Sequence, residues 1–544
     1  MADFDVAVVG SGAGGGVLAW ALASRGWRVA LVEKGRSPYP TLGDAELRGS
    51  LLGNDEIRGR RFYAFHDPLI EPRTFRDGAT APARVGAVQG LGVSVGGGTV
   101  QYDADSPRLQ RADLRRLSLS GPVAGADVVD WPIDYDELVP VYDEVERLIG
   151  VQGEAGADPF TEPRGPYPMA PGYASKAGTV LSAGARSLGY HPHPMPMAIN
   201  SRFYRGRPAC VNCGFCGVGC PINAKGSTAV TVVRDALLTD RCTLLAECCV
   251  VAVDVEPSGA RATGLRYIDG MGVERSLTAD HVVLAANAIE TPRLLLASTS
   301  TAHPDGLGNG SGLVGRYLTF HVIFATIGVF GEEIRSYRGR VITHAMGDFT
   351  SPGNYVDGIR GGYVELGGSI HPVEEGVSYP RLLHKELITT GPYRRRIAAV
   401  SMIGEDMPVA DNRVELDPTV RDVYGRPVAR ITYARHPEDQ RLVDTYMPKL
   451  VEIAVAAGAV DTLSYDTAVE EGIPSTRHLH GTTRMGIDPT RSVTDPWGRL
   501  HEVENVWIAD GGLWPTSGAF NPTLTQQALA LRTALHIDAV DPRP

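Results

Sequence analysis

The sequence begins with an apolar run at residues 4–9 that leads directly into the glycine-rich turn GSGAGG at residues 10–15. A helical pattern follows over residues 15–25, and a second apolar run covers residues 29–33. This order predicts a strand, a tight turn, a helix and a second strand. It is typical of the unit that begins a dinucleotide-binding domain, so it limits the fold more than any other feature of the chain.

The residues of the turn have separate expected roles. Gly10 allows the tight turn, Gly12 lets the backbone approach a pyrophosphate, and Gly15 lets the helix pack close to the strand. Phosphates would then lie beside Ala13 at the helix N-terminus, where free N–H groups favour anions. Glu33 ends the second strand, where an acidic side chain can bond ribose hydroxyls. The motif alone does not separate FAD from NAD, and a purely structural glycine-rich turn is the alternative.

A second glycine-rich segment, RVGAVQGLGVSVGGGTVQY, covers residues 84–102 and contains Gly97, Gly98 and Thr99. Backbone without side chains can lie against a flat ring or a phosphate, because nothing blocks the approach. We therefore expect this segment to contact the cofactor. A mobile surface loop is the alternative interpretation.

Two segments near the C-terminus carry candidate catalytic groups: HLHGTTRMG at residues 478–486 and NPTLT at residues 521–525. Oxidation of an alcohol needs a base for the hydroxyl proton while hydride leaves the same carbon, and histidine suits this role. His478 is the candidate base, although His480 is a rival on spacing and a loop histidine is often structural. The amide of Asn521 could hold the same hydroxyl and fix its orientation.

The residues around Asn521 predict a further contact with the cofactor. Pro522 and Thr523 are typical of the first helical positions, and the helix is expected to run to Leu531. The start of this helix could stabilise negative charge on the N1–C2=O edge of a reduced flavin. Asp510 and Gly511, in the loop after the strand that begins near Val506, complete the expected cofactor-binding set.

Composition limits the classes of partner. The chain has 544 residues, which predicts at least two domains. Its formal net charge of -11 excludes nucleic acid as an expected partner, because phosphate binding needs a basic surface. The N-terminal residues lack the features of a signal peptide, and no apolar run reaches the ~20 residues that a membrane span needs. These features predict a cytoplasmic protein without a membrane span.

At the level of its motifs, the chain resembles the glucose–methanol–choline (GMC) oxidoreductase family. Within that family it is similar to bacterial pyranose oxidases and dehydrogenases, and to the large subunits of gluconate and fructose dehydrogenases. The matching motifs span nearly the whole chain: the N-terminal turn with VEKG at 32–35, VGGGT at 95–99, WPI at 131–133, AANAIETP at 285–292, and the segments that begin at His478 and Asn521.

The resemblance implies FAD as the cofactor and hydride transfer from the alcohol carbon to the flavin N5. It places the proton-accepting histidine on His478, with Gly481, Thr482 and Met485 in register, and its partner on Asn521. The implied reaction is oxidation of a CH–OH group of a sugar, a glycoside or an aminosugar-like polar alcohol. The electron acceptor would be oxygen, a quinone or a partner protein.

The predicted architecture combines an α/β layer with an antiparallel β layer. Apolar strand patterns near the start, the middle and the end of the chain favour one discontinuous Rossmann-like domain, whereas short strands after residue 316 favour an antiparallel sheet. We expect an FAD-binding domain and a substrate domain that contains the Cys-rich segment. The expected ranges are 1–165, 221–320 and 475–544 for the first, and 166–220 and 321–474 for the second.

One position argues that FAD is bound without a covalent bond. Fungal pyranose oxidases of this family attach FAD through a histidine two residues after the Ser or Thr that closes the glycine-rich loop. The corresponding residue here is Gln101. Since a glutamine cannot form that bond, the resemblance implies non-covalent FAD.

Four cysteines with the spacing C-x2-C-x2-C-x3-C-P occupy residues 210–220: Cys210, Cys213, Cys216 and Cys220. This is the spacing of a bacterial ferredoxin run, so the thiolates could hold an iron–sulfur cluster. Similar segments in large subunits of the fructose-dehydrogenase type hold a three-iron cluster, whereas other GMC proteins carry related segments in which a cluster need not be present. One disulfide with two free thiols, or a zinc site, are the alternatives.

Two other functions remain open from the sequence. The chain could be the catalytic subunit of an electron-transfer dehydrogenase complex with an iron–sulfur cluster, or a flavoprotein reductase that does not act on alcohols. Substrate contacts are expected within residues 321–474. The polar residues there, Asp348, Glu365, His344 and Tyr363, are individually expected to be surface or sheet residues more often than substrate contacts.

Overall fold

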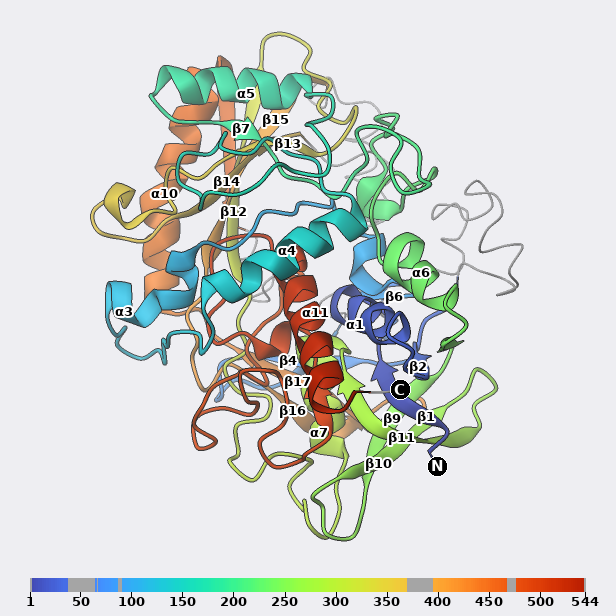
Figure 1. The fold of residues 1–544 in the computed structure, drawn as a ribbon. Helices are drawn as coiled ribbons and strands as arrows, with labels where there is room; N and C mark the ends of the chain where they lie inside the picture. The colour runs from blue at the N-terminus through green and yellow to red at the C-terminus, as the bar shows by residue number, and fades with distance from the viewer. Residues whose placement is uncertain are drawn as a thin grey trace.

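The computed structural model describes residues 2–37, 64–65, 67–86, 91–368, 395–466 and 476–542. Two β layers divide the molecule (Figure 1). A mostly parallel sheet with helices lies in the lower half of this view, and an antiparallel sheet with two long helices lies in the upper half. Both ends of the described chain lie in the lower half, where Asp541 bonds His281.

The lower sheet is built on five parallel strands in the order β8-β2-β1-β11-β19. Their cores are apolar and β-branched, as expected for strands that are covered on both faces. Val8, for example, pairs with Leu31 on one side and Val283 on the other, and all three are fully buried. The bounds are β1 Phe4–Val9, β2 Val29–Val32, β8 Cys242–Leu245, β11 Glu274–Leu284 and β19 Val506–Ile508.

Two antiparallel strands extend this sheet, in the order β11-β10-β9. β9 covers Cys249–Val255 and β10 covers Ala262–Ile268. The helices of this half are α1 Ala13–Ala23, α4 Tyr135–Ile149, α6 Arg234–Leu237, α7 Asn287–Ala297 and α11 Thr523–Val540, with the short α3 at Arg116–Ser120. β1, α1 and β2 follow the predicted strand, turn, helix and strand within two residues at each boundary.

The upper sheet has six strands in the order β18-β12-β15-β14-β13-β7, and each neighbouring pair is antiparallel. Its helices α5 and α10 pack against it (Figure 1). Tyr446 of α10 is fully buried in the core between these helices and the sheet. The bounds are β7 His193–Pro194, β12 His321–Phe330, β13 Ile342–Met346, β14 Gly362–Gly367, β15 Ile397–Glu405, β18 Ala459–Asp466, α5 Lys176–Ser187 and α10 Pro437–Ala456.

A third sheet joins segments that are far apart in the chain. β17 Pro427–Tyr433 pairs with β16 Arg413–Arg421 and, in parallel, with β4 Arg73–Asp77, which pairs with β5 Arg84–Gly86. A two-stranded ribbon, β3 Ala64–Phe65 with β6 Gly92–Val93, lies apart from it. Arg73 of β4 is buried and donates two hydrogen bonds to Glu290 of α7.

The predicted fold class, a Rossmann-like α/β layer with an antiparallel β layer, is confirmed. The domain boundaries stay a prediction. One element is longer than expected, because α11 continues nine residues beyond Leu531 to Val540. The first turn of this extension and Ile537 stay buried, and Arg532 bonds Glu137 of α4, whereas Val540 at the end of the helix is exposed.

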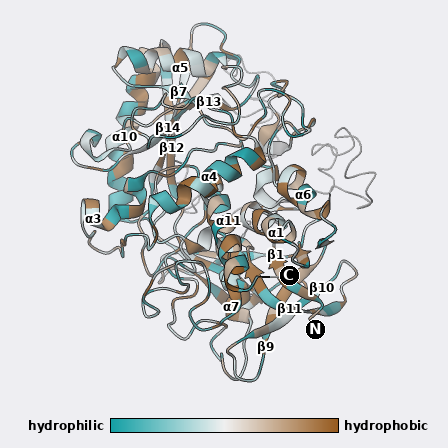
Figure 2. Cartoon of the chain, viewed as in Figure 1, coloured by the Kyte–Doolittle hydropathy of each residue, from teal (hydrophilic) through white to brown (hydrophobic). Residues whose placement is uncertain are grey.

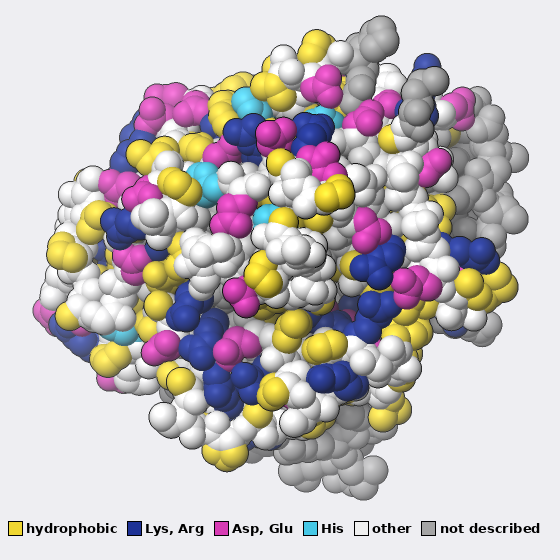
Figure 3. Space-filling model, turned by 90° about the horizontal axis from the view of Figure 1, so that it is seen from below, with side chains coloured by type: hydrophobic (Ala, Val, Ile, Leu, Met, Phe, Trp, Pro, Cys, Tyr) yellow, Lys and Arg dark blue, Asp and Glu magenta, His cyan; other side chains and the backbone are white. Residues whose placement is uncertain are grey.

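Hydropathy and charge follow these layers. Apolar residues gather on β1, β11 and α1 inside the lower half, whereas α5 and α10 turn polar residues outward (Figure 2). Seen from below, the surface carries Lys and Arg side chains with Asp and Glu between them (Figure 3). Within the described residues, no helix combines the length and apolar character that a bilayer crossing demands. The cytoplasmic location stays a prediction.

Gly14 makes the closest contact between α1 and the segment that follows β19. A Cβ atom at this position would lie 1.6 Å from the carbonyl oxygen of Ala509. We expect Gly14→Ala to lower the free energy of unfolding by about 1–3 kcal/mol, because the helix must move to make room for the methyl group. Thermal and urea unfolding of the purified protein measure this change.

Gly331→Ala is the matched control, since a Cβ atom at that exposed glycine meets nothing within 4 Å. It should change stability by only a few tenths of a kcal/mol. Equal unfolding midpoints for the two variants would show that the contact between Gly14 and Ala509 is not tight.

Candidate active site

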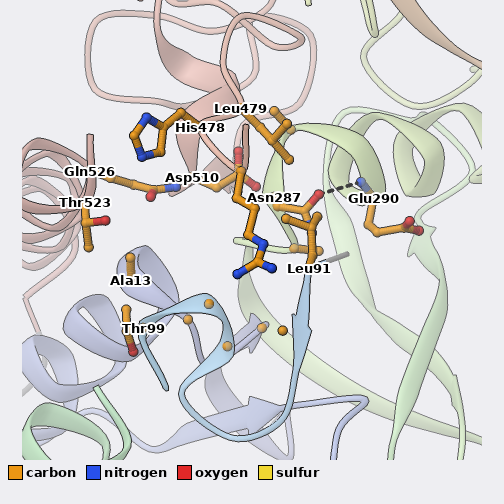
Figure 4. A pocket seen from close by; sticks show the side chains of 18 of the residues that line it. Ala13, Leu91, Thr99, Asn287, Glu290, His478, Leu479, Asp510, Thr523 and Gln526 are labelled. Atoms are coloured by element: carbon orange, nitrogen blue, oxygen red, sulfur yellow. Dashed lines mark hydrogen bonds between the residues drawn. The ribbon is translucent and has the colours of Figure 1, made fainter. Parts of the chain in front are cut away.

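A cavity of about 890 Å³ lies between the two β layers. Its walls come from the turn after β1, the second glycine-rich segment, the start of α7, residues 476–480 and the start of α11. Strands β12, β14 and β15 of the upper sheet close the other side. In Figure 4, His478 lies above Thr523 and Gln526 of α11, while Ala13 and Thr99 lie below the same space.

The turn between β1 and α1 offers bare backbone to this cavity. Gly10 has φ +95°, a left-handed conformation that favours glycine, and a Cβ at Gly15 would lie 1.9 Å from the Gly10 carbonyl. Gly12 precedes α1, and no side chain caps the N–H groups of the first turn near Ala13. Those groups therefore remain available to an anion.

Two glycines leave room where a side chain would fill the cavity. A Cβ built at Gly12 has its nearest neighbour 3.9 Å away, at the Cα of Gly97, and one built at Gly98 meets nothing within 4 Å. Both residues line the cavity, so their missing side chains create a cradle at its floor. The cradle fits a phosphate chain or a flat ring that approaches the backbone closely.

Glu33 lies at the end of β2, lines the cavity and also holds the turn together. One carboxylate oxygen accepts hydrogen bonds from the backbone N–H and the hydroxyl of Ser11, at 3.0 and 2.7 Å. The other accepts from the N–H of Gly35 at 2.8 Å. A carboxylate oxygen has more than one lone pair, so a ribose hydroxyl could still donate to it.

The second glycine-rich segment packs directly on the first. The N–H of Gly96 donates to the Ser11 hydroxyl at 2.9 Å, and a Cβ at Gly97 would lie 2.9 Å from the Cα of Gly12. The Thr99 hydroxyl bonds the Gly96 carbonyl at 2.6 Å and lies 3.0 Å from the Thr228 hydroxyl. Thr99 therefore stabilises the loop, while its position also lines the cavity.

The loop after β19, which contains the expected residues Asp510 and Gly511, is fixed in part by Thr291, which was not among the expected site residues. The Asp510 carboxylate accepts from the Thr291 hydroxyl at 2.6 Å and from the Gly512 N–H at 2.8 Å. Burial raises the pKa of Asp510 to about 6. Gly511 is required because a Cβ there would lie 2.1 Å from the Leu479 carbonyl. Thr291 belongs to the AANAIETP motif at residues 285–292, and this motif was the feature of the sequence that could have identified it.

The start of α11 faces the cavity through Asn521, Pro522 and Thr523. Pro522 precedes the first helical residue, Thr523, and no side chain caps the free N–H groups of this turn. The helix therefore presents a positive end to the cavity. The predicted helix start at this position agrees with the structure within one residue.

A pair of histidines forms the centre of the candidate site. Nδ1 of His478 lies 2.8 Å from Nδ1 of His321, at the start of β12. Nε2 of His321 lies 3.0 Å from the carbonyl oxygen of Ser517. His321 is fully buried and burial lowers its pKa to about 4, while burial also lowers the pKa of His478 well below its ordinary value. Both rings are therefore neutral near pH 7.

This geometry fixes which nitrogen of each ring carries the proton. A carbonyl oxygen only accepts, so Nε2–H of His321 donates to Ser517 and its Nδ1 is an acceptor. Nδ1–H of His478 must then be the donor in the bond between the two rings. It follows that Nε2 of His478 carries a lone pair, which is what a general base requires.

The rival histidine has a different environment. The ring of His480 stacks on Trp514, with centroids 4.5 Å apart and an angle of 25°. Neither of its nitrogens has a hydrogen-bond partner among the described residues. Both His478 and His480 line the cavity, but only the tautomer of His478 is set by a neighbour.

Asn521 is held by the upper sheet. Its Nδ2 donates to Glu365 of β14 at 3.0 Å, and the other Glu365 oxygen accepts from the Ser401 hydroxyl of β15 at 3.0 Å. Of the four polar residues weighed from sequence, Glu365 lines the cavity, whereas Asp348 bonds His191 and His344 lies beside Thr343. Tyr363 is buried, and its hydroxyl lies 3.4 Å from His193.

The four cysteines of residues 210–220 line one small pocket of about 10 Å³ that is separate from the large cavity. Cys210, Cys213 and Cys216 are free thiols. In the part of the chain that the structure describes, no group of three or more His, Cys, Asp or Glu is placed to hold a metal ion. The thiols are thus neighbours, but their side chains do not form a ready ligand set.

Comparisons with known proteins agree with this arrangement. Residues 127–323 and 408–530 match the N- and C-terminal family models described as GMC oxidoreductase, and residues 8–41 match an NAD(P)-binding Rossmann-like domain. The pyridoxine 4-oxidase of Mesorbium loti has the same fold, with a TM-score of 0.65 and 18% identity over 99% of each chain.

Three curated relatives match nearly the whole chain. The 2-methyl-1,2-propanediol dehydrogenase of Mycolicibacterium austroafricanum is 31% identical over 99% of this chain and 97% of its own length. The paromamine 6'-oxidase of Streptomyces fradiae is 32% identical over 98% and 90%, and the fructose dehydrogenase large subunit of Gluconobacter japonicus is 30% identical over 97% of each chain. The chain therefore belongs to the GMC oxidoreductase family and is an FAD-dependent alcohol oxidoreductase.

Proposed function

We propose that this enzyme oxidises the CH–OH group of a sugar, a glycoside or an aminosugar-like polar alcohol, with His478 as the proton acceptor. The observation that carries the proposal is the lone pair that the His321 contact leaves on Nε2 of His478, at the wall of the cavity that Asn521 also lines. Relatives named as oxidising a diol and paromamine support a polar alcohol as the substrate.

The residues present fit FAD. The uncapped N–H groups after Gly12 would hold the pyrophosphate, and Glu33 would bind the ribose hydroxyls. The bare backbone at Gly97 and Gly98 would lie against the flavin. Asp510, with Pro522 and Thr523 at the positive end of α11, would contact its far edge. FAD supplies the acceptor for the hydride that leaves the alcohol carbon.

The protein itself handles the proton. Nε2 of His478 accepts the hydroxyl proton, and Nδ1–H of the same ring stays bonded to His321. Because His321 is neutral and is held by the Ser517 carbonyl, it keeps the His478 ring in one orientation and one tautomer. His321 is therefore a positioning residue, since it acts on substrate only through His478.

Asn521 orients the hydroxyl. One N–H of its amide donates to Glu365, which leaves the second N–H for the substrate oxygen. The hydrogen bond to Glu365 fixes the amide, and Ser401 fixes Glu365 in turn. When the amide of Asn521 and the imidazole of His478 both hold the substrate oxygen, the alcohol carbon is aligned for hydride transfer. Such alignment lowers the activation barrier.

Variants of the histidine pair test the proposed base. We expect His478→Ala to lower kcat/KM by about 10²–10⁴-fold, the usual contribution of a general base. His321→Ala should cost about 10–100-fold, as for other partners that orient a histidine. His321→Gln should recover part of that loss, because its amide can accept from His478 and donate to Ser517. Anaerobic reduction of the bound flavin by a panel of sugars and aminosugars measures these effects.

The pH profile gives an independent readout. His478 works only while it is neutral, and its pKa is lowered by burial, so activity is lost only as pH falls through that lowered value. The acid limb of kcat/KM should therefore lie below the ordinary histidine pKa of about 6.5. His480→Leu is the control; if it lost more activity than His478→Ala, His480 would be the base.

We also propose that FAD is bound without a covalent bond, on the basis of Gln101. This residue follows the loop-closing Thr99 and lines the cavity. Precipitation with acid should release all yellow colour into the supernatant. Colour that remains with the protein pellet, with a matching mass increase of the intact chain, would contradict non-covalent binding.

The second candidate function is a dehydrogenase that passes electrons through an iron–sulfur cluster to a partner protein. Its support is the shared pocket of Cys210, Cys213, Cys216 and Cys220, although the thiols would have to rearrange to bind iron. If the cluster exists, anaerobically purified protein should contain iron and acid-labile sulfide in at least stoichiometric amounts. Sulfide far below stoichiometry would rule it out.

The electron acceptor is tested with the same preparation. Oxygen uptake with an alcohol would identify an oxidase, whereas reduction of a quinone or a dye without oxygen uptake would identify a dehydrogenase. Bleaching of the flavin by NADH, and by no alcohol, would instead select the reductase function and overturn the proposal.

A further inference from the structure

Three carboxyl groups line the large cavity and lie near enough to interact electrostatically: Asp103, Asp105 and Glu365. We call them the acidic cluster. Asp103 and Asp105 follow the glycine-rich segment that forms the cavity floor, and Glu365 comes from β14 of the upper sheet. Asp105 and Glu365 are both more than nine-tenths buried, with 8% and 9% of the residue exposed, respectively. Buried carboxylates at one place are costly unless a positive group balances them.

The carboxylates repel one another. Burial raises the pKa of Asp105 well above its usual value, and the charges of Glu365 and Asp103 raise it further. Burial, with the charge of Asp103, also raises the pKa of Glu365. Oδ1 of Asp103 and Oδ1 of Asp105 are buried and have no hydrogen-bond partner among the residues described.

The positive side chains near the cluster also contact other groups. Nζ of Lys225 donates to the carbonyl oxygens of Val100 and Cys216, both at 2.6 Å. Arg340 bonds the sulfur of Met197 and the carbonyl of Tyr173. Arg477 is exposed at the cavity wall and lowers the pKa of Asp103 from there. These charges do not cancel the effect of burial, which raises the pKa of all three carboxyl groups.

The amide oxygen of Asn521, beside the acidic cluster, also lacks a hydrogen-bond donor among the described residues. Oδ1 of Asn521 is buried and has no partner in the described part of the chain, and only 8% of this residue is exposed. Its Nδ2 is bonded to Glu365, so this oxygen lies next to the acidic cluster. This part of the cavity therefore contains several buried acceptor oxygens. A ligand with N–H or O–H donors and a positive charge would satisfy them.

The shape of the site favours an organic cation over a metal ion. Within the described ranges, no three of these acidic side chains are placed to hold a metal ion. A protonated primary amine has three N–H donors and a charge, and it can bond carboxylates that are spread along a wall. A quaternary ammonium group has no N–H and would leave the acceptor oxygens unpaired.

We propose that the acidic cluster binds a protonated amine of the substrate, so that the enzyme acts on an amino sugar or amino cyclitol in preference to a neutral polyol. This inference rests on the proposed alcohol oxidation. Because Glu365 is bonded to Asn521, which holds the reacting hydroxyl, the amine lies within a few bonds of the oxidised carbon. Asp103 and Asp105 bind the amine, and Glu365 both contributes charge and positions Asn521.

The first experiment compares matched substrates with the holoenzyme. Each amino sugar is paired with its hydroxyl counterpart and with its N-acetyl derivative, and anaerobic reduction of the flavin is followed for each. We expect kcat/KM for the free amine to exceed that for both neutral partners by about 10–100-fold, the effect of one charged hydrogen bond. Added salt should reduce this preference, because it screens the attraction.

The second experiment changes the cluster. Asp105→Asn should lower the ratio of kcat/KM for the amine to that for its hydroxyl counterpart by about tenfold or more. Asp348→Asn is the control, because Asp348 bonds His191 and does not line the cavity. A thermal-shift assay adds a readout without turnover: the amino sugar should raise the melting temperature of the native protein more than that of Asp105→Asn.

The outcomes separate the two proposals. If neutral sugars reduce the flavin as fast as their amines, or if Asp105→Asn lowers both equally, the amine site is wrong while alcohol oxidation stands. If a quaternary ammonium alcohol is preferred to the primary amine, the donor requirement is wrong. If neither amines nor neutral alcohols reduce the flavin, the proposed function itself fails. Retained flavin content and melting temperature would show that the variant is folded.

Discussion

The hydrogen bond between the Ser517 carbonyl and His321 is the contact on which the candidate chemistry depends. Because a carbonyl can only accept, it decides the proton position on His321, and His321 then decides the proton position on His478. The carbonyl oxygen of Ser517 thus determines, through two successive hydrogen bonds, that Nε2 of His478, the proposed base, carries a lone pair. No charged partner is needed, and burial keeps both rings neutral.

The fold brings this chain of contacts together from separate layers. His321 starts β12 of the upper sheet, His478 lies in the segment that returns to the lower half, and Ser517 lies in the loop before α11. The same loop leads to Asn521, which the upper sheet holds through Glu365. His478 and Asn521, the two residues proposed to contact the substrate hydroxyl, are therefore each tied to a different strand of one antiparallel sheet.

Much of the cofactor half could be predicted from sequence, because its signals are local. Gly10, Gly12 and Gly15 lie within one turn, and that turn has the expected strands and helix around it. The length of α11 could not be predicted as well. Arg532 reads as the end of an apolar helix, but tertiary contact with Glu137 lets it stay in a buried helix.

The substrate half was harder to predict for a physical reason. His321 contacts His478 across 157 residues of sequence, and the strand that contains it reads as ordinary β structure. Glu365 was expected to be a sheet residue, and it lies in β14. The alternation of side chains along a strand, however, does not indicate which elements or cavities each face of the strand contacts. The pairing of β4 with β17 likewise joins positions more than 340 residues apart, for which no local pattern exists.

The bond between Glu365 and Asn521 has a mechanical consequence. It crosses from the middle of β14 to the start of α11, so it joins the two β layers at the point where a substrate would react. Any sliding of one layer over the other would displace this amide, and it would also move His321 of β12 relative to Ser517 and His478. Alignment of the hydroxyl should thus depend on the relative position of the two layers. Substitutions that shift β14 from outside the cavity should therefore slow turnover.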